Sequence, residues 1–209
     1  MDKHKETLET WNKVASLYQE KFMKMDIYND TYDFICNSIE KPNAKLLEIG
    51  CGPGNITSYL LAKRPDFDIF GIDNAPNMIE LAKLNNPKAD FAVMDCRLIK
   101  NLKDQYDGIV GGFCLPYLSS IESNDLIATA YNLLNENGLL YLSFVEGNPE
   151  ESDFKVGSGG RVFFNYHKLE EIIAQLNSFN FRDINTFKVE YKISDSEFDI
   201  HTILTAKKH

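Results

Sequence analysis

Apolar residues in the first forty positions recur at three- and four-residue spacing, which is the period of an amphipathic helix. One such segment, residues 7–22, carries Leu8, Trp11, Val14, Ala15, Tyr18 and Phe22. A second helix is predicted over 28–39, and Pro42 with Asn43 breaks the chain after it. We therefore expect two amphipathic helices before the first strand.

Beyond residue 43 the pattern changes to short apolar runs that alternate with helical segments. The predicted strands are 44–49, 67–72, 90–94, 106–111 and 139–145. The predicted helices between them are 55–63, 76–85 and 122–135. Apolar strands that alternate with helices are typical of a parallel sheet covered on both faces.

The C-terminal part follows a different pattern. Segment 147–160 is rich in glycine, serine and acidic residues and is predicted to be a loop. After a helix at 167–177, strands at 181–192 and 197–207 are joined by a tight turn at Ser194-Asp195-Ser196. A tight turn makes two strands antiparallel. The sequence thus predicts one doubly wound α/β domain with a C-terminal hairpin and N-terminal helices.

Composition narrows the possible partners. The formal net charge is −9 and the isoelectric point is about 5.0, so an acidic surface disfavours nucleic acid and anionic membranes. The four cysteines show no zinc or disulfide spacing, and we expect reduced thiols and no metal. No signal peptide or membrane span is recognisable, which predicts a soluble, cytoplasmic protein.

The loop after the first strand carries the strongest chemical signal. It reads Glu48-Ile49-Gly50-Cys51-Gly52-Pro53-Gly54 and leads directly into a helix. Glycines let the backbone approach a ligand closely, and a helix N-terminus offers free N–H groups to an anion. The spacing is G-x-G-x-G, whereas a nicotinamide-dinucleotide fold has G-x-G-x-x-G.

Two acids follow at the ends of the next strands. Asp73 ends the second strand, 23 residues after Gly50, where a carboxylate can accept hydrogen bonds from ribose hydroxyls. Asp95 ends the third strand, where a carboxylate could receive the exocyclic amine of adenine. Both acids could also have a purely structural role, since Asp73 could cap the following helix and Asp95 could stabilise a turn.

These segments together resemble the motifs of class I S-adenosylmethionine-dependent methyltransferases. The segments are Leu46 to Gly54, Gly71-Ile72-Asp73 with Met78 to Ala82, Met94-Asp95-Cys96, Tyr106 to Val110, and Leu133 to Leu140. Five motifs occur in order and at the usual spacing over about residues 40–146. The resemblance implies a seven-stranded, mostly parallel, Rossmann-like sheet with a closing antiparallel hairpin, and S-adenosylmethionine as the cofactor.

The resemblance also implies roles for individual residues. The backbone of Gly50, Gly52 and Gly54 would lie against the methionine part of the cofactor, and Glu48 and Cys51 are also expected to bind the cofactor. The remaining expected cofactor residues are Asp73 at the ribose, Asp95 and Cys96 at the adenine, Asn74 and Met78 beside either, and Gly112 and Phe113 near the reactive methyl group. Cysteines such as Cys51 and Cys96 are more often small packing residues than nucleophiles, and no neighbouring residue in the sequence suggests activation.

Substrate-side residues are less clearly marked. In relatives the first helix often covers the cofactor, and a segment such as Arg161, Tyr166 and His167 often lies over the substrate. Tyr18 and Tyr117 could also face the substrate, although packing explains both, and His167 could simply begin a helix. The expected organisation of the single domain 1–209 is a helical lid at 1–40, a cofactor core at 41–146, and a substrate-side part at 147–209.

The predicted function is a methyltransferase acting on a small molecule by in-line displacement, with no catalytic base assigned. Methyltransferases of nucleobase amines commonly carry an Asn- or Asp-Pro-Pro-aromatic sequence, and Gly112 to Tyr117 lacks it. The alternatives are a non-catalytic protein that binds S-adenosylmethionine or S-adenosylhomocysteine, and a methyltransferase of protein or RNA. A nicotinamide-dependent oxidoreductase is disfavoured by the glycine spacing. The sequence identifies neither the acceptor nor the oligomeric state.

Overall fold

The computed structural model describes residues 2–157, 159–193 and 198–209. Its helices are α1 Lys3–Lys13, α2 Ala15–Phe22, α3 Asn29–Ser38, α4 Asn55–Lys63, α5 Pro76–Asn85, α6 Ser120–Leu133 and α7 Leu169–Ser178, with short 3₁₀ segments η1 Cys96–Asn101, η2 Leu115–Tyr117 and η3 Pro149–Glu151. Its strands are β1 Lys45–Ile49, β2 Asp68–Asp73, β3 Asp90–Val93, β4 Tyr106–Gly111, β5 Leu134–Val145, β6 Asp153–Gly157, β7 Gly160–Phe164, β8 Phe181–Lys192 and β9 Phe198–Lys208.

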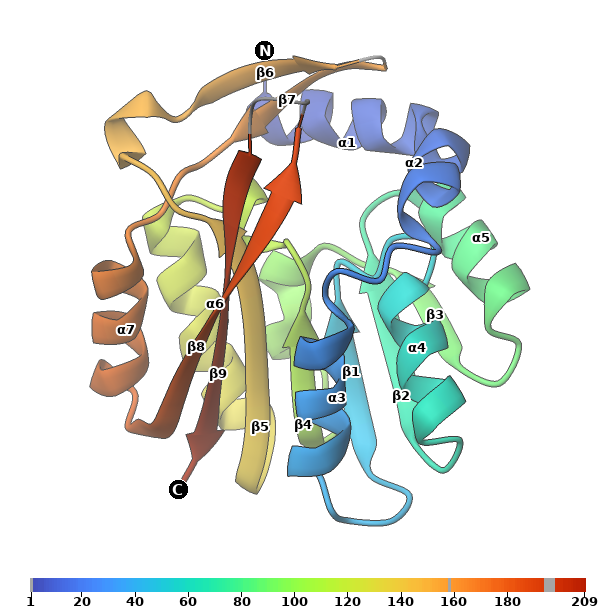
Figure 1. The fold of residues 1–209 in the computed structure, drawn as a ribbon, viewed down its shortest axis with the longest axis vertical. Helices are drawn as coiled ribbons and strands as arrows, with labels where there is room; N and C mark the ends of the chain where they lie inside the picture. The colour runs from blue at the N-terminus through green and yellow to red at the C-terminus, as the bar shows by residue number, and fades with distance from the viewer. Residues whose placement is uncertain (1, 158, 194–197) are drawn as a thin grey trace.

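Seven strands form one twisted sheet in the order β3-β2-β1-β4-β5-β9-β8 (Figure 1). The first five strands in this order pair in parallel, and β9 runs antiparallel to both β5 and β8. The predicted doubly wound sheet with its closing antiparallel hairpin is confirmed. The predicted turn at Ser194-Asp195-Ser196 lies outside the described residues.

Helices cover both faces of the sheet because the inner strands carry apolar residues on both faces. In β1, Leu46 packs with α3 and α4, whereas Leu47 and Ile49 pack with residues of α6 and α7. These three side chains are essentially inaccessible to solvent. Burying a side chain of this size contributes about 1.5–3 kcal/mol. The hydrophobic clusters on the two faces of the sheet therefore both include β1, which lies at the centre of the fold.

The strand order reverses on either side of β1, which pairs with β2 on one edge and β4 on the other. The carboxyl ends of β1, β2, β3 and β4 therefore meet at one edge of the sheet. Helices α1 and α2 lie across this edge (Figure 1). The topology thus brings the glycine loop, Asp73 and the loop after β4 under the N-terminal helices.

The N-terminal helical segment differs from the single helix predicted over 7–22. The backbone leaves helical geometry at Val14, with φ −99° and ψ 12°, and this break divides α1 from α2. The two helices contact different partners, since α1 lies along β7 and both helices touch α5. One straight helix could not contact both sets of partners. The three- and four-residue spacing continues across the break and therefore does not reveal it.

The predicted loop at 147–160 was wrong in part. Residues 153–157 and 160–164 pair as a two-stranded antiparallel hairpin, β6–β7, in which Gly157 opposes Gly160. The apolar residues of this segment alternate with polar ones, but its many glycines and acids obscured the period of two. The hairpin lies against α1, because Phe163 N donates a hydrogen bond of 2.9 Å to Thr7 Oγ1.

Two further boundaries moved. Helix α6 begins at Ser120 instead of 122, since Ser119 and Glu122 form a reciprocal capping box. Strand β5 begins at Leu134 instead of 139.

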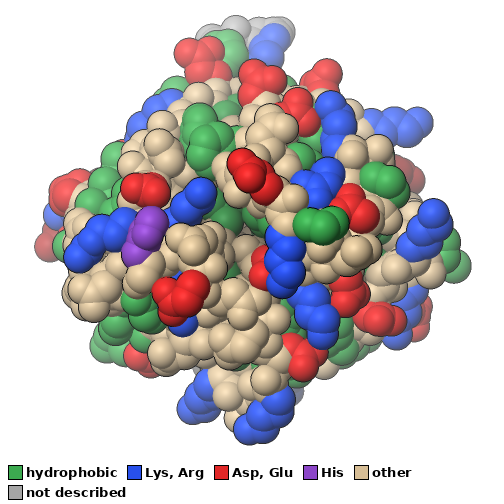
Figure 2. All heavy atoms as spheres, turned by 90° about the horizontal axis from the view of Figure 1, so that it is seen from below, with side chains coloured by type: hydrophobic (Ala, Val, Ile, Leu, Met, Phe, Trp, Pro, Cys, Tyr) green, Lys and Arg blue, Asp and Glu red, His purple; other side chains and the backbone are tan. Residues whose placement is uncertain are grey.

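Among the described residues, no helix has both the length and the hydrophobicity that a membrane span requires. On the end of the molecule opposite α1 and α2, acidic and basic side chains are interspersed (Figure 2).

Candidate functional site

The glycine loop between β1 and α4 has a backbone that favours glycine. Gly50, Gly52 and Gly54 have φ of 67°, 53° and 80°, in the left-handed region that other residues rarely adopt. Gly54 is also packed tightly, because an added Cβ would collide with Nδ2 of Asn86, which donates a 2.9 Å hydrogen bond to Gly54 O. Gly54 therefore shapes the loop, whereas a Cβ at Gly50 or Gly52 would only reach ordinary contact with Cys114 or Tyr18, at 3.4 and 3.6 Å.

Asp73 fixes the loop from the neighbouring strand. Its Oδ2 accepts a hydrogen bond of 2.9 Å from Gly52 N, and its Oδ1 accepts one of 2.8 Å from Ala75 N. Burial raises the pKa of Asp73, against the effect of these backbone hydrogen bonds. The carboxylate thus ties the glycine loop to the start of α5 while it lines a cavity.

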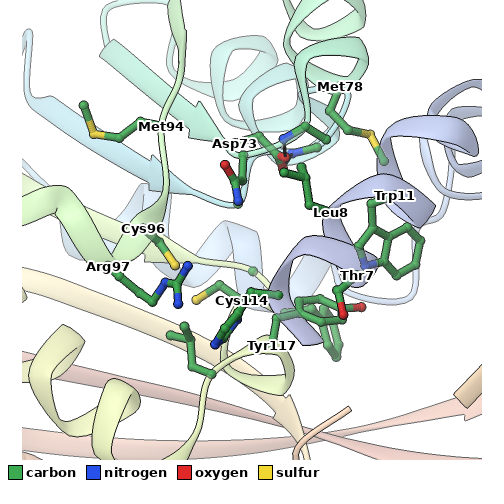
Figure 3. A pocket seen from close by; sticks show the side chains of 18 of the residues that line it. Thr7, Leu8, Trp11, Asp73, Met78, Met94, Cys96, Arg97, Cys114 and Tyr117 are labelled. Carbon is green, nitrogen blue, oxygen red and sulfur yellow. Dashed lines mark hydrogen bonds between the residues drawn. The ribbon is translucent and has the colours of Figure 1, made fainter. Parts of the chain in front are cut away.

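This first cavity, here called the Asp73 cavity, has a volume of about 160 Å³. Its wall residues come from α1, α2, the glycine loop, the β2–α5 segment, η1 and the loop after β4: His4, Thr7, Leu8, Trp11, Tyr18, Gly50, Gly52, Asp73, Asn74, Ala75, Met78, Met94, Cys96, Arg97, Gly112, Phe113, Cys114, Tyr117 and Leu118. Figure 3 shows Asp73 and Met78 facing Cys96 and Arg97 across the cavity, with Trp11 to one side.

Asp95 lies next to this cavity without lining it. Its carboxylate caps η1 through Arg97 N and forms an ion pair with the Arg97 guanidinium, at 2.5 Å between Oδ2 and Nη2. Arg97 also pairs with Glu122 at 3.2 Å. The charged group that reaches the cavity from this strand end is therefore Arg97, which the sequence motifs did not single out.

A second cavity, here called the aromatic cavity, has a volume of about 220 Å³. Rings from nine elements or loops line it: Trp11, Tyr18, Phe22, Tyr28, Tyr32, Phe113, Tyr117, Phe164, Tyr191 and His201. The other residues of its wall are Met25, Glu48, Gly50, Cys51, Asn55, Ile56, Gly112, Pro116, Val145 and Asp199. This cavity extends from the glycine loop toward the C-terminal hairpin.

Six residues line both cavities, so the two spaces share a wall: Trp11, Tyr18, Gly50, Gly112, Phe113 and Tyr117. Trp11 contacts Tyr18 and Tyr117 edge-on, with ring centroids 5.6 and 5.7 Å apart. Phe113 has a φ of 55°, and its N–H donates a 2.8 Å hydrogen bond to Ser143 Oγ. A strained non-glycine residue at this wall is a common mark of a functional site.

Glu48 brings a carboxyl group into the aromatic cavity. The residue is 2% exposed, and its Oε2 accepts a hydrogen bond from Thr57 Oγ1. Within the described part of the chain its Oε1 has no hydrogen-bond partner. Burial raises the pKa of Glu48 to about 8. A buried acceptor without a partner is costly, which points to a ligand group that pairs with it.

His201 lies on the opposite side of the aromatic cavity, on β9. Its Nδ1 is 2.7 Å from the Tyr28 hydroxyl, and its ring stacks on Tyr191 at a centroid distance of 4.8 Å. Phe113 meets the same imidazole edge-on at 4.7 Å. Burial among these rings lowers the pKa of His201 to about 4, so the imidazole is neutral at physiological pH.

Three residues expected near the substrate lie outside both cavity walls. Arg161, on β7, pairs with Glu6 of α1, and its carbonyl accepts a 2.8 Å hydrogen bond from Thr10. His167 is buried, with Nε2 at 2.9 Å from Leu115 O. Tyr166 N donates to Ser152 Oγ at 3.0 Å. Of the expected substrate residues, Tyr18 and Tyr117 are the two that line the cavities.

The sequence reasoning missed much of the aromatic cavity. Phe22, Tyr28, Tyr191, Asp199 and His201 belong to no motif, and β8 and β9 reach this edge only through the closing hairpin. The available signal was weak: an excess of tyrosine and phenylalanine near the polar ends of predicted elements. No group of histidine, cysteine and acidic side chains within the described residues could hold a metal ion.

Comparisons with known proteins show similarity to one domain family. Residues 46–138 match the sequence model of a family described as "Methyltransferase domain". The chain is 30% identical to a carboxy-S-adenosyl-L-methionine synthase of Campylobacter hominis, over 49% of this chain and 45% of that protein. It is 34% identical to a trans-aconitate 2-methyltransferase of Enterobacter, over 51% of this chain and 41% of that protein.

The chain spans about half the length of the curated relatives it matches. Its fold is similar to that of magnesium protoporphyrin IX methyltransferase from Synechocystis, crystallised with bound SAM. The TM-score is 0.74 at 16% identity, and the match covers 100% of this chain and 98% of the other. At this identity the likeness establishes the fold.

Proposed function

We propose that this protein, which contains a class I methyltransferase domain, binds S-adenosylmethionine across its two cavities and methylates a small molecule in the aromatic one. One observation carries the proposal: the two cavities meet at the carboxyl edge of the sheet, beside the strand-order reversal, and share a wall of six residues. A methyl donor on one side of that wall and an acceptor on the other would meet there.

The Asp73 cavity suits the adenosine half of the cofactor. The Asp73 oxygens accept from Gly52 and Ala75 and retain lone pairs for the two ribose hydroxyls. Asn74 and Met78 would lie beside the ribose or adenine, and Cys96 would contact the adenine. In this proposal Asp95 acts indirectly, since its ion pair orients Arg97 at the rim of the cavity.

The glycine loop suits the methionine half. Gly50 and Gly52 line the cavities with backbone alone, which leaves room for a ligand, while Cys51 and Gly54 maintain the shape of the loop. The free Oε1 of Glu48 would accept a hydrogen bond from the ammonium group of the ligand. A cationic partner there would also remove the cost of the unpaired buried oxygen.

When bound, the cofactor supplies an electrophilic methyl group on a sulfonium with a good leaving group. The contribution of the chain is to hold the two reactants in line and to exclude water, because positioning alone lowers the barrier by several kcal/mol. Trp11, Tyr18 and Tyr117 form an aromatic wall where the methyl group would pass, and aromatic faces attract a positive charge. Gly112 and Phe113 complete that wall.

We further propose the organisation expected from the sequence, with a lid at 1–40, a cofactor core at 41–146 and a substrate-side part at 147–209. All three parts contribute to the aromatic cavity, through Trp11, Phe113 and His201 respectively. A concave space of about 220 Å³ lined in this way suits a small molecule better than a protein or RNA segment. The four free cysteines agree with a cytoplasmic location.

The test has two stages. Thermal-shift and calorimetric titrations with S-adenosylmethionine, S-adenosylhomocysteine and NADH are expected to show binding of the two sulfur ligands and no effect of NADH. Stabilisation by NADH alone would overturn the cofactor assignment. Incubation with labelled S-adenosylmethionine and a metabolite extract should then yield a labelled small molecule. Binding without any labelled product would favour the non-catalytic alternative.

A further inference from the structure

We propose that the acceptor is an organic amine with a small apolar body, recognised as an ammonium ion by the rings and acids of the aromatic cavity and methylated on nitrogen. The inference rests on the proposed function and specifies its substrate class. It is carried by three features of the aromatic cavity: a nearly continuous series of aromatic rings, its acidic residues, and its size.

The rings of the aromatic cavity contact one another in a series. Starting from β7, the neighbouring centroid distances are 6.3 Å for Phe164–Tyr117, 5.7 Å for Tyr117–Trp11, 5.6 Å for Trp11–Tyr18, 4.4 Å for Tyr18–Phe22, 6.5 Å for Phe22–Tyr191, 4.8 Å for Tyr191–His201 and 4.7 Å for His201–Phe113. Ring faces bind organic cations, and aromatic cages are the usual receptor for ammonium groups.

The wall carries two acidic residues. Glu48 lies at the glycine-loop end and Asp199 on β9, and no lysine or arginine occurs among the described residues that line this cavity. Lys21 approaches the rings of Phe22 and Tyr191, at 5.1 and 5.5 Å from their centroids, without being part of the wall. A carboxylate acceptor would therefore find no cation on this wall.

The acidic group assigned to the acceptor is Asp199. It pairs in register with Tyr191 on β8, and alternation places it on the same face of β9 as His201. Glu48 is the proposed partner of the cofactor, so Asp199 is the remaining acid for a second cation. His201 is neutral and hydrogen-bonded to Tyr28, so it adds no positive charge to this side of the cavity.

The charge balance of the reaction favours an amine in such a cavity. A neutral amine, formed when the bound ammonium loses a proton to water at the Asp199 end, attacks the methyl carbon with its lone pair. The carbon–sulfur bond breaks, its electron pair stays on sulfur, and the positive charge passes to nitrogen. Because the charge remains positive throughout, ring faces and acids stabilise the transition state; a carboxylate would instead cancel the charge.

The size of the cavity limits the body of the amine. The aromatic cavity measures about 220 Å³, and an apolar cavity of about 150 Å³ accommodates benzene. Part of the space adjoins the glycine loop, where the cofactor would end. A single ring or a short alkyl chain with a terminal amine therefore fits this space.

Matched probe sets test the charge preference directly. The sets are benzylamine, benzyl alcohol and benzoate; phenethylamine, phenethyl alcohol and hydrocinnamate; and hexylamine, hexanol and hexanoate. Calorimetric titration into the complete chain saturated with S-adenosylhomocysteine measures binding without requiring turnover. At least one amine is expected to bind at least about tenfold more tightly than its alcohol and its carboxylate. Labelled methyl transfer to that amine is measured in parallel.

Two variants separate recognition from general charge effects. Asp199→Asn should lower the affinity for the amine by about tenfold and leave the affinity for S-adenosylhomocysteine unchanged. Glu190→Gln removes the same charge from an exposed position on β8 and should change amine binding by less than about twofold. If no amine binds more tightly than its isosteres, or if both variants act alike, the amine assignment is wrong. Failure of S-adenosylhomocysteine to bind would instead refute the proposed function.

Discussion

Glu48→Gln should make the protein more stable at neutral and alkaline pH, although it changes a residue at the centre of the site. The wild-type carboxyl is buried, its Oε1 is unpaired, and its pKa is raised from an ordinary 4.5 to about 8. Glutamine has nearly the same shape, keeps an acceptor for Thr57 and cannot ionise. The substitution therefore removes the cost of burying a charge while preserving the packing.

The size of the effect follows from proton linkage. Between pH 4.5 and about 8 the folded protein binds more protons at this residue than the unfolded chain, so its contribution to stability falls as pH rises. The slope approaches about 1.4 kcal/mol per pH unit, and the total is about 3 kcal/mol from about pH 5 to about pH 8. The advantage of the variant over wild type should grow by that amount.

Urea unfolding of both proteins across this pH range measures the difference. Glu136→Gln is the matched control, since Glu136 is an exposed acid on β5. This substitution should change the free energy of unfolding by the same small amount at every pH. A wild-type–variant difference that stays constant from about pH 5 to about pH 8 would refute the burial argument. It would mean that Glu48 is hydrated or paired in solution.

The same residue predicts a pH dependence of ligand binding. Glu48 must lose its proton to pair with an ammonium group, so wild-type affinity for S-adenosylhomocysteine should rise by up to about tenfold per pH unit below about pH 8. The glutamine variant should bind more weakly at alkaline pH and show no such rise. Calorimetry at several pH values checks this, and equal pH profiles would separate Glu48 from the ligand.

Three further outcomes are expected. Asp73→Asn should weaken S-adenosylhomocysteine by at least about tenfold, since an amide presents N–H groups toward one of two backbone donors; unchanged calorimetric affinity in a folded variant would exclude Asp73 from the site. Gly54→Ala should lower the free energy of unfolding by more than about 1 kcal/mol, because φ is 80° and Asn86 occupies the space, and a wild-type urea midpoint would contradict this. Arg161→Met should speed amide exchange in β6 and β7, because it removes the ion pair to α1, and unaltered exchange would show that the remaining contacts suffice.

The central sheet was predictable because its signals are local. Apolar runs such as residues 44–49 and 106–111 form strands that are buried on both faces, and the helix at Pro76–Asn85 coincides with its prediction. The closing hairpin followed from two long strands near the end of the sequence. Errors concentrated where side-chain pairing sets the boundary, as at the Ser119–Glu122 capping box.

Of the cavity walls, the sequence singled out residues at strand ends together with Tyr18 and Tyr117. Gly50, Gly52 and Asp73 sit at strand ends, and the topology of parallel strands brings such ends together. His201 and Tyr191 reach the same edge through antiparallel pairing, for which the sequence offers no motif. His167 shows the reverse case, because the sequence singled it out and its imidazole binds the carbonyl of Leu115, outside the cavity walls.

Helix α1 is positioned to control the rate at which ligands leave, since its Trp11 belongs to the walls of both cavities. The helix is held against β7 by hydrogen bonds of Thr7 and Thr10 and by the Glu6–Arg161 ion pair. Lifting this one helix would open both spaces at once. In the proposed enzyme, spent cofactor and methylated product would then leave during a single opening event. The rate of that event, governed by contacts remote from the reacting atoms, would set the ceiling on turnover.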